Sequence, residues 1–291
     1  MSENIPPLTP GILPDTDECI EQAYFFQRFR ERLADNVSAQ EILTRAHEEL
    51  ITSTRLPYAV QFLATEMKHA GLLASGFARL PHYFTPFQTF VIQQAENDGS
   101  KFTIVTALLV LEREASFKSK TPTPAGLFVY QFEAIARNRL GYDVGLTAMA
   151  GDPFYGPEWK VYIEMVRRQG GTIDFCELVY LRSEQYVIDQ RRTKPDYIPS
   201  MPPLYGAKEG RIAKASRGRD PLFLFAALQR QLAYPEIPRH RGTTDLDGRL
   251  QAYEVKIREL DARIRMLESE QRGTFDPTQF GKPDILRDPD E

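Results

Sequence analysis

Glu66 and His69 are the residues whose types and spacing most suggest chemistry in this 291-residue chain. They lie three positions apart within residues 57–80, where apolar residues recur at helical spacing. Glu66 falls in the middle of that apolar stripe, so a helix here would turn a carboxylate toward the core. An inward-facing Glu-x-x-His pair is how several helical bundles hold transition metals. The sequence therefore offers a metal site with Glu66, His69 and, from another helix, His47 as ligands.

A structural role for Glu66 competes with the metal site. A two-metal centre needs a second Glu-x-x-His pair, which the sequence lacks. A single-metal site would add Glu112 or Glu133, which lie on or beside other apolar stripes. In the structural interpretation Glu66 forms a buried ion pair that fixes how two helices dock. The arginines considered for that pair are Arg55, Arg79 and Arg137. We expect this structural role and no cofactor, with a transition metal as the alternative.

Other signals for catalysis are missing from the sequence. It contains no phosphate-binding glycine loop of the GxxxxGK[ST] or GxGxxG type, no HExxH and no GxSxG. Only four histidines occur, and a hydrolytic triad is not visible. Cys19 and Cys176 form neither a CxxC pair nor a disulfide framework. A net charge of −4 gives no overall attraction to nucleic acid or anionic membranes. We therefore expect a non-enzymatic protein.

The elements that would position these residues are predicted to be helices. Between residues 17 and 190 no run alternates apolar and polar residues between hairpin turns, so the body is expected to be all-α. Ser38 with Glu41 three residues later forms a capping-box pattern at a helix start. Four prolines occupy first-turn positions, where a missing N–H costs no intrahelical bond. They are Pro86, Pro124, Pro157 and Pro221.

The prolines also divide the body into three helix pairs. Pro86 and Pro124 are 38 residues apart, and Pro124 and Pro157 are 33 apart. The segment "LGYDVGLTAMAGDPFYGPEWKVY" follows the pattern best. Over about 100 residues this organisation resembles tetratricopeptide-like repeats, whose period is about 34 residues. The Trp-Leu-Gly-Tyr consensus of that family is missing from all three units. The resemblance implies a helical-hairpin array, and a plain helical bundle is the alternative.

Residues 191–244 change in composition. They are rich in proline, glycine and basic residues, and we expect a linker or surface arm. One short helix, "PLFLFAALQRQLAY", is too apolar to stay exposed and should dock onto the body. The basic stretch "KEGRIAKASRGR" suggests a nucleic-acid-binding arm as a further alternative. Few aromatic residues stand there to stack on bases, so we do not expect nucleic-acid binding.

The heptad pattern near the C-terminus predicts a coiled coil. The apolar seam consists of Leu246, Leu250, Tyr253, Ile257, Leu260, Ile264 and Leu267, with steps that alternate between four and three. The positions that flank the seam are basic on one side (Arg249, Lys256, Arg263) and acidic on the other (Glu254, Asp261, Glu268). These charges attract across a parallel pair and repel across an antiparallel one. The pattern predicts a parallel homodimer. A helix docked on its own body would need a wider apolar face.

These patterns together predict five segments. They are a disordered arm at 1–16, a helical body at 17–190, the basic linker at 191–244, a coiled coil at 245–271 and a disordered tail at 272–291. The first residues lack the pattern of a signal peptide, and no apolar run approaches the ~20 residues of a membrane span, so we expect a cytoplasmic protein. The predicted function is a dimeric scaffold with a protein partner. The alternatives are a helical-bundle metal-dependent oxidase using Glu66 and His69, and a basic-arm nucleic-acid binder.

Overall fold

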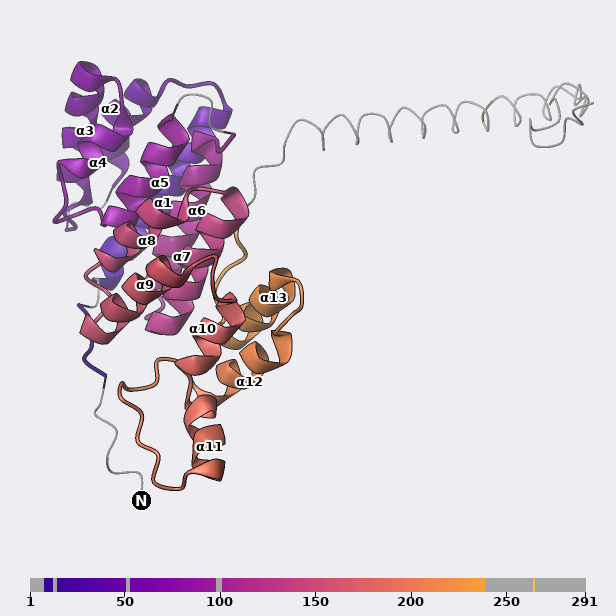
Figure 1. The fold of residues 1–291 in the computed structure, drawn as a ribbon. Coiled ribbons are helices and arrows are strands. Elements are labelled where there is room, and N and C mark those ends of the chain that lie inside the picture. The colour runs from indigo at the N-terminus through magenta and orange to yellow at the C-terminus, as the bar shows by residue number, and fades with distance from the viewer. Residues whose placement is uncertain (1–7, 13–14, 51–52, 98–100, 239–263, 265–291) are drawn as a thin grey trace, which may run out of the picture. The chain divides into compact units, whose positions relative to one another are not determined.

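A computed structural model describes residues 8–12, 15–50, 53–97, 101–238 and 264 (Figure 1). Within these residues there are thirteen α-helices, and no strand forms beyond two isolated bridges, so the fold is all-α as predicted. In chain order the helices are α1 (Thr16–Ala34), α2 (Ala39–Glu49), α3 (Leu56–Ala70), α4 (Leu73–Ala78), α5 (Pro86–Glu96), α6 (Ile104–Lys118), α7 (Pro124–Asn138), α8 (Tyr142–Ala150), α9 (Pro157–Gln169), α10 (Phe175–Leu181), α11 (Glu184–Thr193), α12 (Ala207–Ser216) and α13 (Pro221–Leu232). None of these helices combines the length and the apolar character that crossing a membrane requires.

The predicted helix starts are confirmed at all four prolines. Helices α5, α7, α9 and α13 each begin at the proline that the sequence singled out. The residue before the proline caps the helix in three of them, because the side chains of Thr85, Thr123 and Asp220 accept backbone N–H bonds. At α5 the cap is reciprocal, since the Gln88 side chain also accepts the N–H of Thr85. Ser38 caps α2, since its side chain accepts the N–H of Glu41.

The helix predicted for residues 57–80 is divided into α3 and α4. Gly71 ends α3 in the left-handed conformation at φ +70°, and its N–H bonds to the carbonyl of Met67. The chain then restarts as α4, whose first N–H groups need acceptors. The Glu96 carboxylate from α5 supplies them, 2.7 Å from the N of Leu73 and 2.8 Å from that of Ala74. The sequence pattern missed this break because apolar residues continue at helical spacing across it.

The segment 191–244, predicted as a linker with one docked helix, contains a second helix. The docked helix is α13, which buries Leu224, Phe225 and Leu228. The additional helix is α12, which packs against α10, α11 and α13. Its small buried residues, Gly210 and Ala213, permit this close packing. The glycine and basic residues of this segment indicated a linker, so the sequence did not predict α12.

The described part of the N-terminal arm also differs from the expected disorder. The Thr9 hydroxyl donates to Glu158 at 2.8 Å, and the N–H of Ile12 donates to the Pro153 carbonyl at 2.9 Å. Residues 9–12 therefore lie against the turn that leads into α9.

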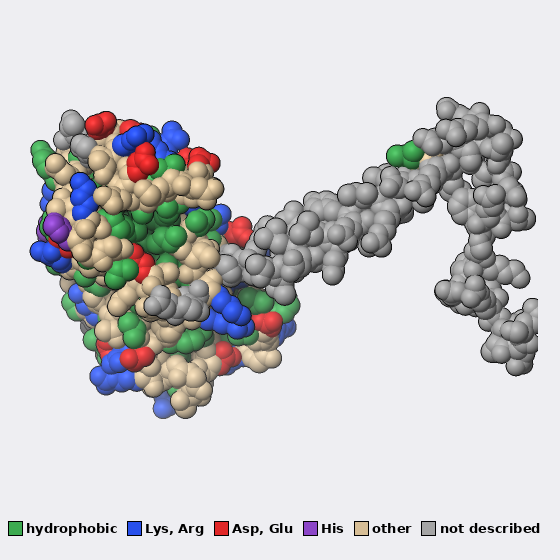
Figure 2. Space-filling view, turned by 90° about the horizontal axis from the view of Figure 1, so that it is seen from above, with side chains coloured by type: hydrophobic (Ala, Val, Ile, Leu, Met, Phe, Trp, Pro, Cys, Tyr) green, Lys and Arg blue, Asp and Glu red, His purple; other side chains and the backbone are tan. Residues whose placement is uncertain are grey.

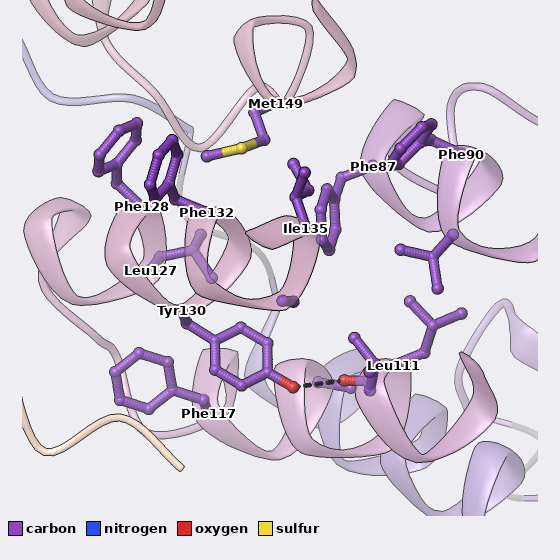
Figure 3. Close-up of a cluster of buried hydrophobic side chains, with 14 of the residues drawn as sticks. Phe87, Phe90, Leu111, Phe117, Leu127, Phe128, Tyr130, Phe132, Ile135 and Met149 are labelled. Carbon is purple, nitrogen blue, oxygen red and sulfur yellow. Dashed lines mark hydrogen bonds between the residues drawn. The ribbon is translucent and has the colours of Figure 1, made fainter. Parts of the chain in front are cut away.

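The core is centred on α6 and α7. Figure 3 shows Ile135 of α7 beside Phe87 of α5, while Tyr130 reaches α6, where its hydroxyl donates to the Val110 carbonyl at 2.7 Å. The most extensive helix pair joins α1 to α6, which are far apart in the sequence. Helix α1 lies outside the three helix pairs that resemble repeats, so the tetratricopeptide-like array and the plain helical bundle both stay predictions.

Candidate functional site

The three residues predicted to bind metal are not brought together by a described contact. Glu66 on α3 is buried, and its carboxylate pairs with Arg79 at the end of α4. His69 lies exposed on the last turn of the same helix. His47 belongs to α2, and its side chain lies outside the described part. In the part of the chain that the structure describes, no three His, Cys, Asp or Glu side chains are arranged to hold a metal.

The other two candidate ligands also have arginine partners. Glu112 on α6 accepts from Arg30 on α1 at 3.0 Å, and Glu133 on α7 pairs with Arg137 one turn later. The Glu66–Arg79 pair was among the alternatives that the sequence offered. These pairs join α3 to α4 and α1 to α6, and they compensate three partly or fully buried carboxylates.

The coiled-coil seam lies almost entirely outside the described residues. Of the seven seam residues only Ile264 is described, as a helical residue that is 51% exposed. Contacts divide the chain into two units, 1–240 and 241–291, so the predicted coil falls in the second unit. The parallel homodimer stays a prediction.

The basic stretch is engaged in the packing of the body. Lys214 on α12 donates to Asp189 on α11 at 2.7 Å, and Arg217 pairs with Glu177 on α10 at 2.6 Å. Hydrogen bonding from Lys214 holds the pKa of Asp189 down, at about 2. The guanidinium of Arg217 also lies 4.2 Å from the ring centre of Tyr180. Lys214 and Arg217, which would contact phosphates in the nucleic-acid-binding alternative, therefore already have acidic partners.

An apolar groove lies among five helices of the body. It encloses about 490 Å³ between α7, α8, α9, α10 and α13. Three phenylalanines from three helices contribute to its lining: Phe132, Phe175 and Phe225. The rings of Phe132 and Phe175 stack with centres 4.1 Å apart, and Phe225 lies within 6.2 Å of both. A cavity of this size and composition falls in the range of protein binding sites.

The rim of the groove exposes further apolar side chains. Tyr142 on α8 is 51% exposed and Leu222 on α13 is 45% exposed, and both line the groove. Next to Leu222, Phe223 is 65% exposed. Figure 2, which views one face of the molecule, shows other hydrophobic side chains interspersed with charged ones. Large exposed apolar patches mark interaction surfaces.

The groove lining contains two charged residues, and both are arginines. Arg167 on α9 is paired through all three of its nitrogens, since it bonds Glu164 at 3.0 and 2.9 Å and Asp143 at 2.8 Å. Arg137 on α7 is only 14% exposed and bonds Glu133 through its Nε. Elsewhere in the described chain no partner takes the Nη1 or Nη2 of Arg137. The sequence could have revealed this pair through its i, i+4 spacing, but it could not place the pair at a groove.

A buried ionic cluster lies at a second, more polar cavity of about 230 Å³. The Lys118 ammonium lies 3.1 Å from Glu114 and 2.9 Å from Asp152, and all three side chains are at most 5% exposed. Burial raises the pKa of Glu114, while Lys118 opposes that shift. Gln131 donates to the same carboxylate at 2.6 Å and accepts from the Tyr155 hydroxyl. No pattern in the sequence indicated this cluster.

Neither cysteine of the body has the properties of a nucleophile. Cys19 lines the polar cavity and Cys176 lies on α10, and both are buried. Burial raises the pKa of each thiol to about 11. A reactive cysteine needs the opposite shift, because only the thiolate attacks.

Comparison with known proteins gives no further guide to function. No protein-family model, no curated protein and no solved structure matches this chain.

Proposed function

We propose that this chain is a non-enzymatic interaction protein that binds a segment of a partner protein in the apolar groove. The observation that carries the proposal is the groove itself, a cavity of about 490 Å³ that is lined by three phenylalanines and by the partly exposed Tyr142 and Leu222. Because Tyr142 and Leu222 line the cavity and are about half exposed, its apolar surface opens to solvent, which favours a polypeptide over an enclosed small molecule. Aromatic residues are enriched at the centres of protein interfaces, and they also line this groove.

In this proposal the protein acts as a dimer. The heptads at 245–271, with basic residues on one side of the seam and acidic residues on the other, support a parallel pair. Each dimer would present two grooves, so a partner with two binding segments would gain avidity. The metal-dependent alternative has weaker support, because Glu66, Glu112 and Glu133 all have arginine partners.

Peptide selection on the intact protein tests the groove. Displayed random 16-residue peptides are selected, and the binders are measured on two matched variants. Leu222→Arg places a charge in the groove, whereas Ile188→Arg alters an apolar residue on α11 with nearly equal exposure, 43% against 45%. We expect binders that weaken at least tenfold on Leu222→Arg and keep their affinity on Ile188→Arg. Binders that are indifferent to Leu222→Arg would contradict the proposal.

Sedimentation of the full chain tests the dimer. Ile257→Asp puts a charge in the seam, and Arg258→Asp puts the same charge at the neighbouring position outside it. We expect the first variant to be monomeric at micromolar concentration and the second to remain dimeric. Leu246→Cys should form a disulfide between two copies when the helices are parallel, because equal positions then lie side by side. A monomeric native chain would refute the dimer.

A further inference from the structure

Arg137 has hydrogen-bonding capacity that no described residue uses. Its Nε bonds the buried Glu133, whose other oxygen accepts from the Tyr234 hydroxyl at 2.6 Å. Within the described residues the two terminal nitrogens of Arg137 have no acceptor, although the side chain is only 14% exposed. These nitrogens are not among the buried side-chain atoms that lack a partner, and they belong to a residue that lines the groove, so a ligand in the groove can supply their acceptor.

We propose that the partner segment carries an aspartate or glutamate whose carboxylate binds Arg137 while neighbouring bulky apolar side chains fill the groove. This inference rests on the proposed function and names the chemistry of its partner. Two adjacent N–H groups of a guanidinium match the two oxygens of a carboxylate. The lining of the groove holds two arginines and no acidic residue, and of these two only Arg137 has both terminal nitrogens without a described acceptor.

Arg167 provides a matched control in the same groove. Its Nε, Nη1 and Nη2 each already bond Asp143 or Glu164, so both of its terminal nitrogens have an acidic partner before a ligand arrives. A general attraction of acidic peptides by positive charge would depend on both arginines. Recognition by free donors depends on Arg137 alone.

The test uses the groove-dependent peptides selected on the full-length protein. We expect them to be enriched in one acidic residue beside aromatic or branched apolar residues. Replacing that acidic residue by alanine should weaken binding about tenfold to a hundredfold. Arg137→Gln should cause a similar loss, and the two changes together should cost little more than either alone, which is the signature of a direct contact. Arg167→Gln should change affinity by less than about threefold.

The double variant Glu133→Gln/Arg137→Gln guards against misfolding. Arg137→Gln alone leaves the carboxylate of Glu133 buried without its cation, whereas the double variant removes both charges. It should bind as weakly as Arg137→Gln. Glu133→Gln alone, which leaves the arginine uncompensated, should bind acidic peptides at least as well as the native protein. Groove-dependent peptides without an acidic preference, or with one independent of Arg137, would refute this inference and leave the proposed function standing. The absence of groove-dependent peptides would refute both.

Discussion

Replacing Lys118 by methionine tests the buried ionic cluster directly. The ammonium is the shared cation of Glu114 and Asp152, at 3.1 and 2.9 Å, and the two acidic side chains are 0% and 1% exposed. Methionine fills similar space but leaves two carboxyl groups without a cation. Removing one partner from a buried pair costs about 3–5 kcal/mol, which is a large part of the 5–15 kcal/mol that typically stabilises a domain. We therefore expect Lys118→Met to lose about 3–5 kcal/mol of unfolding free energy.

Urea denaturation at neutral pH measures this loss. The midpoint should fall while the slope with urea stays unchanged, because the surface exposed on unfolding is the same. Lys118→Met/Asp152→Asn should recover much of the stability, since asparagine keeps an oxygen for the Phe154 N–H that Asp152 now accepts. The deficit of Lys118→Met should shrink in acid, where protonated carboxyl groups need no cation. A loss below about 1 kcal/mol, the value of an exposed ion pair, would show that these groups are solvated.

Three further changes test other parts of the body by the same denaturation assay. Burial raises the pKa of Glu114, so over part of the pH range the folded chain keeps a proton that the unfolded chain releases. The unfolding free energy should therefore fall as pH rises above the usual range of glutamate. Glu114→Gln should remove that part of the pH dependence. Tyr130→Phe should cost about 1 kcal/mol through loss of the bond to the Val110 carbonyl, with no gross change of structure by circular dichroism. Gly210→Ala should destabilise by about 1–3 kcal/mol although alanine favours helices, because its Cβ would lie 2.2 Å from the Ser183 hydroxyl; a stabilised variant would contradict the close α11–α12 packing.

The helical class and the helix starts could be predicted because their causes are local. A proline at the first helical position, preceded by a capping side chain, acts within three residues, and Thr85 and Thr123 cap as their sequence context indicates. The break after α3 depends instead on a distant group. Gly71 permits the turn, but the acceptors that let α4 restart come from Glu96 on α5. No pattern within residues 57–80 contains that information.

The groove could not be predicted because it has no local signal. Its phenylalanines, Phe132, Phe175 and Phe225, come from three helices and follow the same apolar periodicity as core residues. The cavity arises only where α7, α10 and α13 pack together. The residues of the predicted metal site did have a local signal. Glu66 on an apolar stripe indicated correctly that a carboxylate is buried, but its partner Arg79 became clear only from the placement of α4.

The basic segment shows why composition alone misassigned residues 207–216. Cations count toward a phosphate-binding arm only when they are free, and Lys214 and Arg217 of this segment are paired with Asp189 and Glu177 on neighbouring helices. Because α12 packs against α10 and α13, which both line the groove, these pairs help to hold the groove in shape. Deleting residues 206–219 would therefore disturb the groove as well as remove positive charge. Loss of nucleic-acid binding after that deletion would not identify a phosphate-binding arm, whereas charge reversal at the exposed Lys208 and Arg211 would test one without removing α12.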